Sequence, residues 1–70
     1  MFNRKSYLFA KLNNFYIDKC EEEIIDQTTQ DELIEELESM ETKQLYDLCV
    51  GYELSIPHDM FKDIFGNFLA

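Results

Sequence analysis

The sequence predicts an all-α fold: a small domain of three to four helices that ends in an antiparallel helical hairpin. The 70-residue chain contains only two glycines and one proline, and its apolar residues recur at spacings of three and four. Hydrophobic residues make up 46% of the chain, which is enough for a core. A core of this size contributes only about 3–5 kcal/mol, so oligomerisation or a partner is expected to complete it.

The N-terminal segment, residues 1–26, is predicted to form one amphipathic helix. Residues four apart give an apolar ridge: Leu8, Leu12, Tyr16, Cys20 and Ile24. An alternative stays open, because residues 7–12 and 15–20 are rich in aromatic side chains and could pair as a β-hairpin around Asn13–Asn14. An isolated hairpin is only marginally stable, which favours the helix.

A second, acidic helix is predicted over residues 29–41. Thr29 followed by Glu32 has the spacing of a capping box. One face of this helix is apolar, formed by Leu33, Ile34, Leu37 and Met40. The carboxylates outside that face are Glu32, Glu35, Glu36 and Glu38.

Residues 42–70 are predicted to form the helical hairpin. Thr42 is expected to cap its first helix, whose apolar face is Leu45, Leu48, Cys49 and Tyr52. Residues 54–56 form the turn, and Pro57 suits the first turn of the last helix. That helix has a broad apolar face made by Met60, Phe61, Ile64, Phe65, Phe68 and Leu69.

Charge excludes several kinds of partner. The formal net charge is −9, and residues 18–41 contain eleven acidic residues and one lysine. Such a surface repels phosphate backbones and anionic lipid, so direct binding of nucleic acid or of a membrane is not expected. No stretch approaches the eighteen or so apolar residues of a membrane span, and no signal peptide is recognisable. A cytoplasmic protein is the expectation.

Catalysis is not expected. Cys49 and His58 are the one conceivable nucleophile and base, but Cys49 falls on a predicted buried face. The spacing of Cys20 and Cys49 matches no zinc pattern, and both are expected to stay reduced in a cytosolic chain. No phosphate-binding loop or metal-binding motif is present in the sequence. We therefore expect neither a metal nor a cofactor.

The predicted function is regulatory binding to another protein. The anchor would be an apolar set on the hairpin: Ile56, Met60, Phe61, Phe65 and Phe68. The acidic helix would then set the association rate and the choice of partner. In one alternative Glu32, Glu35, Glu36 and Glu38 imitate DNA phosphates, as in small phage-encoded inhibitors. In another, the phenylalanine-rich helix holds a structural homo-oligomer such as a homodimer.

Residues 53–64, ELSIPHDMFKDI, resemble the turn and second helix of the Sda family of sporulation-kinase inhibitors. The hairpin is also similar to the dimerisation hook of the SinI/SinR proteins. The resemblance implies a small helical inhibitor that docks on a histidine kinase or a DNA-binding regulator. In the Sda pattern the contact residues correspond to Ile56 and Met60, where the family has an aromatic residue in place of Met60. The acidic residues 18–41 have no counterpart in that family.

Overall fold

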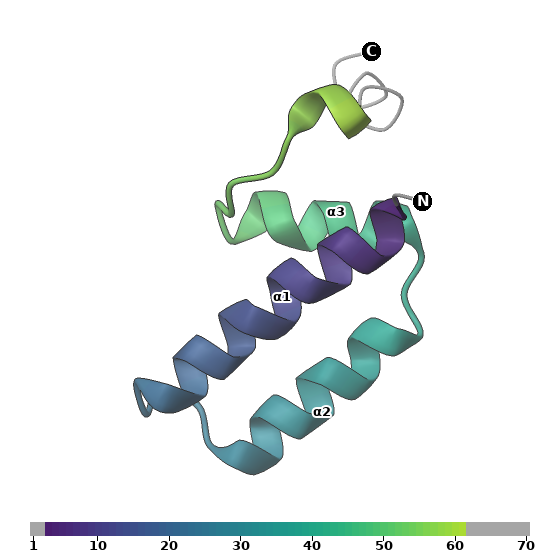
Figure 1. The fold of residues 1–70 in the computed structure, drawn as a ribbon. Helices are drawn as coiled ribbons and strands as arrows, with labels where there is room; N and C mark the ends of the chain where they lie inside the picture. The colour runs from purple at the N-terminus through teal and green to yellow at the C-terminus, as the bar shows by residue number, and fades with distance from the viewer. Residues whose placement is uncertain (1–2, 62–70) are drawn as a thin grey trace.

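The computed structural model describes residues 3–61. Three α-helices follow one another: α1 (Arg4–Glu21), α2 (Gln27–Glu38) and α3 (Thr42–Gly51). A 3-10 turn, η1 (His58–Phe61), comes after them (Figure 1). No strand occurs in this part of the chain, so the predicted all-α class is confirmed. Helix α1 runs through both segments of the alternative β-hairpin, which decides that question for the helix.

Helix α1 ends five residues before the predicted boundary. It begins at Asn3, whose side chain accepts a hydrogen bond from the Ser6 N–H at 3.1 Å. Its C-terminal end is a Schellman turn, in which the Ile24 N–H donates to the Lys19 carbonyl at 2.9 Å and Glu23 has φ 62°. The turn reverses the chain after the fifth helical turn, so Ile24 leaves the apolar ridge and is 63% exposed.

The other two helices begin at carboxylate residues rather than at the predicted threonines. Asp26 caps α2, because its Oδ1 accepts from the Thr29 N–H at 2.7 Å. Glu41 is the N-cap of α3, and its N–H donates to Gln44 Oε1 at 2.9 Å. The predicted caps Thr29 and Thr42 are therefore wrong, by three positions and by one.

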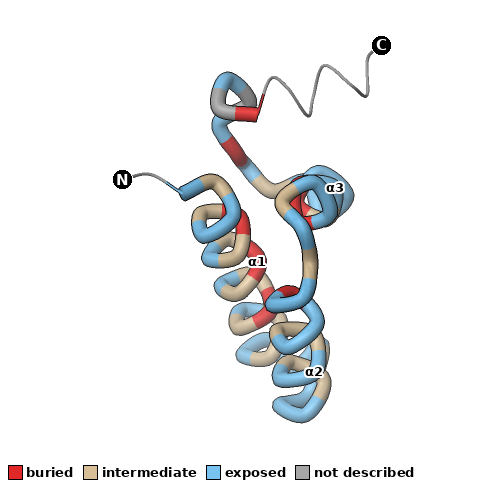
Figure 2. The backbone as a smooth tube through the Cα atoms, turned by 90° about the vertical axis from the view of Figure 1, so that its right-hand side faces the viewer, coloured by how far each residue is buried: buried red, intermediate tan, exposed pale blue. Residues whose placement is uncertain are grey.

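Helix α1 lies between α2 and α3 and packs against both (Figure 1). The buried residues, red in Figure 2, come from all three helices and from the segment after α3. They are Leu8, Leu12, Tyr16, Leu37, Leu45, Tyr46, Cys49, Ile56 and Phe61. Most of these positions follow from the predicted apolar faces, whereas the full burial of Tyr46 was not predicted.

Residues 54–61, here called the C-terminal strap, leave α3 through a second left-handed residue, Glu53, with φ 60°. The strap crosses back above α3 toward the start of α1 (Figure 1). The turn lies at Tyr52 and Glu53 rather than at the predicted residues 54–56, which are irregular, and the chain then enters the 3-10 turn. The rest of the predicted last helix, with Phe65 and Phe68, lies outside the described residues, as does the completion of the helical hairpin.

Candidate protein-binding surface

The first candidate surface is the solvent side of α2. The opposite, apolar side of α2 faces α1, with Leu37 only 1% exposed, while Leu33 and Ile34 are half-buried. This orientation turns the predicted carboxylates outward, and all four are exposed: Glu32, Glu35, Glu36 and Glu38. These four residues are called the acidic face from here on. Glu32, Glu35 and Glu36, together with Ser39, line a shallow hollow of about 440 Å³.

The acidic face is not neutralised from within its own helix, since α2 contains no lysine or arginine. Asp31 adds a fifth exposed carboxylate and accepts a hydrogen bond from Gln27 Nε2 at 3.0 Å. The pKa of Tyr16 is raised mainly by burial and by its hydroxyl contact with Tyr52, and the charge of Glu36 raises it further.

The two described side chains of the predicted apolar anchor are buried, unlike the carboxylates of the acidic face. Phe61 is 0% exposed, with its ring 5.4 Å from the Tyr46 ring and 5.7 Å from the Arg4 guanidinium. Ile56 is 8% exposed and belongs to the same core. Both side chains therefore pack inside this chain. The side chain of Met60 and all of Phe65 and Phe68 lie outside what the structure describes, so their role as anchors stays a prediction.

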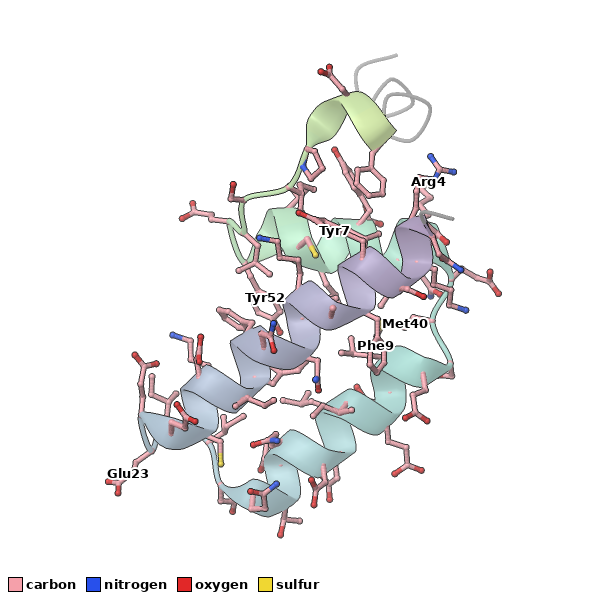
Figure 3. The ribbon with its side chains drawn as sticks, viewed as in Figure 1. Arg4, Tyr7, Phe9, Glu23, Met40 and Tyr52 are labelled. Carbon is pink, nitrogen blue, oxygen red and sulfur yellow. The ribbon has the colours of Figure 1, made fainter. Side chains whose placement is uncertain are left out.

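A half-exposed aromatic cluster joins α1 to the end of α3, and the sequence reasoning missed it as a unit. The Phe15 ring stacks on Tyr52 with centroids 4.5 Å apart, and Lys19 Nζ lies 5.1 Å from the Phe15 centroid. The Tyr16 and Tyr52 hydroxyls are 3.1 Å apart. Tyr52 lies on the α3 side of α1, whereas Phe9 and Met40 lie on the α2 side (Figure 3). The signal available in the sequence was the aromatic pair Phe15 and Tyr16.

Of the one conceivable nucleophile and base, the structure describes the side chain of Cys49 and not that of His58. Burial raises the pKa of the Cys49 thiol to about 11, so the thiol is protonated near neutral pH. Both cysteines are free, and the half-buried Cys20 lies near Gln27, with its sulfur 3.9 Å from Oε1. His58 belongs to η1, and its side chain lies outside the described set. Within residues 3–61, no group of three or more potential ligands is placed to hold a metal ion.

None of the helices in the described part of the chain is long and apolar enough to cross a membrane. No protein-family model matches the sequence, and the comparisons with curated proteins and with solved structures found no match.

Proposed function

We propose that this is a non-enzymatic regulatory protein that binds another protein and blocks its nucleic-acid-binding site with the acidic face of α2. Of the two partner classes expected from the sequence, this proposal favours a DNA-binding regulator over a histidine kinase. The observation that carries it is the exposure of every carboxylate of that face, while Ile56 and Phe61 of the apolar anchor are enclosed.

The charge spacing of α2 supports imitation of a phosphate backbone. Five exposed carboxylates lie between residues 31 and 38. At a rise of about 1.5 Å per residue, these eight positions cover about 12 Å, or roughly one negative charge per 2.4 Å. DNA carries one charge per about 3.4 Å along a single strand and per about 1.7 Å along the duplex. The charge density of α2 therefore falls between that of one strand and that of a duplex.

The distribution of the remaining charges makes the molecule electrostatically asymmetric. Four of the basic residues, Arg4, Lys5, Lys11 and Lys19, lie on α1 and none lies on α2, while Lys5 lines a hollow together with Glu38. A positively charged nucleic-acid-binding groove on the partner therefore attracts the acidic face of this protein, which raises the association rate at low ionic strength. When the partner's groove is empty it also attracts DNA, so this protein and DNA compete for the same site.

The experiment uses two variants with equal net charge. The first removes the acidic face with Glu32→Gln, Glu35→Gln, Glu36→Gln and Glu38→Gln. The control removes four exposed acids elsewhere with Asp18→Asn, Glu21→Gln, Asp47→Asn and Glu53→Gln. Both change the formal net charge by the same amount, from −9 to about −5. Only the position of the lost carboxylates differs between them.

Each immobilised protein is challenged with DNA-binding proteins eluted from DNA-cellulose, at 0.1 M and at 1 M salt. The proposal predicts that wild type and control retain the same partner at 0.1 M, and that the acidic-face variant does not. Retention should be lost at 1 M, where the screening length is only about 3 Å. Equal retention by both variants would contradict the proposal. Retention that persists at 1 M salt would instead favour an apolar anchor.

A further inference from the structure

The C-terminal strap is seated on the helices through a few buried side chains. Phe61 lies between Tyr46 of α3 and Arg4 of α1, and Ile56 enters the same core. The seat is thus made by α1 and α3, while the strap comes from later in the chain. In Figure 1 the strap crosses above α3, and Phe61 at its end reaches Arg4 in the first turn of α1.

The connection between α3 and its strap holds an unfavourable backbone conformation. Glu53 has φ 60°, a region that an L-residue with a Cβ atom rarely adopts. This residue closes the helix, because its N–H donates to the Val50 carbonyl at 3.0 Å and the Leu54 N–H donates to the Cys49 carbonyl at 2.9 Å. The left-handed turn sends the strap back over its own α3. If Glu53 becomes extended, the strap is directed away from that seat.

We propose that the seat also binds the strap of a second copy of this chain, so that two copies exchange residues 54–61. The seat and the strap are identical in both copies, so Ile56 and Phe61 fill the partner's seat with the contacts that they make in their own. Opening extends the short connection around Glu53, which releases its left-handed conformation, and withdraws Ile56 and Phe61 from their own seat until the partner's seat takes them. The residue before Pro57, Ile56, is already biased toward extended backbone.

Charge sets the conditions for exchange. Each copy carries a formal net charge of −9, so two copies repel each other at low ionic strength. Salt screens this repulsion, and the exchanged dimer should gain stability as salt rises. Binding through the acidic face has the opposite salt dependence. The two proposals can therefore fail independently.

The chain offers a matched pair of variants for the test. Glu53→Gly removes the strain that favours opening, and Glu23→Gly makes the same change at the end of α1, away from the strap. A left-handed glutamate lowers the ratio of closed to open strap by roughly fivefold relative to glycine. Because two connections open for each dimer, Glu53→Gly should weaken dimerisation by roughly 25-fold, while Glu23→Gly leaves it unchanged.

Dimerisation is measured by sedimentation velocity from micromolar to millimolar protein at 0.1 M and 0.5 M salt. Mixed isotope labelling of wild type then tests the exchange directly, because nuclear Overhauser contacts between the Phe61 and Tyr46 rings must connect labelled with unlabelled copies. A dimer with those contacts, weakened selectively by Glu53→Gly, supports the exchange. A monomer at every concentration would overturn it, as would a dimer whose Phe61 contacts only the Tyr46 of its own chain.

Discussion

Phe61→Ala should cost this protein a large part of its stability, although the residue lies beyond the last α-helix. The ring is 0% exposed and contacts the Tyr46 ring and the Arg4 guanidinium at centroid distances of 5.4 and 5.7 Å. Truncation of a fully buried phenylalanine costs about 3–5 kcal/mol through lost transfer energy and the cavity left behind. A domain of this length has a total free energy of unfolding of about 3.5–10 kcal/mol.

The assay is urea unfolding followed by helical circular dichroism at micromolar protein. Phe61→Leu is the control, because it keeps an apolar side chain in the seat and should cost about 1 kcal/mol. An equal slope m for the variants and wild type shows that the change lies in stability rather than in the unfolded state. A cost below about 1 kcal/mol for Phe61→Ala would refute the reasoning, because a ring whose loss matters so little is not part of the core.

Three further results are expected from the helix ends and the thiols. Glu23→Gly should stabilise the fold by about 0.5–1 kcal/mol in urea unfolding, since glycine adopts φ 62° without strain, and no gain would contradict the left-handed assignment. The hydrogen bond from the Thr29 N–H lowers the pKa of Asp26, so its contribution is present above about pH 4 and is lost as pH falls through the folded pKa. Asp26→Asn should remove that part of the acid dependence and keep the cap, and an unchanged pH profile would contradict this. Cys49, with a pKa of about 11, should resist iodoacetamide at pH 8 until urea is added, whereas the half-buried Cys20 should react in the folded protein, as mass spectrometry of the labelled peptides will show.

The spacing of apolar residues was sufficient to predict the helices and most of the core. Leu8, Leu12 and Leu37 lie where a period near 3.6 places them, because amphipathic helices in a small bundle bury one stripe. The helix ends were harder to predict. Asp26 rather than Thr29 caps α2, and Glu23 ends α1 in a conformation that sequence rules assign to glycine.

For the candidate surfaces, too, features set by position within one helix could be predicted, whereas features set by the packing of distant segments could not. The exposure of Glu35 and Glu38 follows from their positions relative to Leu37 on one helix, so it was predictable. The enclosure of Ile56 and Phe61 depends on where the strap crosses α1 and α3, which no local pattern specifies. The same apolar residues that suggest a partner's anchor in the sequence therefore serve as core in the folded chain.

The most direct test of the acidic face is a displacement titration on the DNA-binding protein that the retention experiment identifies. A labelled duplex is first bound to that protein, and its fluorescence anisotropy is followed as this chain is added. Wild type and the control variant should release the duplex completely, and the variant that lacks the Glu32, Glu35, Glu36 and Glu38 carboxylates should leave it bound. A ternary complex, in which the duplex stays bound while this chain also binds, would contradict the proposal that α2 occupies the nucleic-acid site.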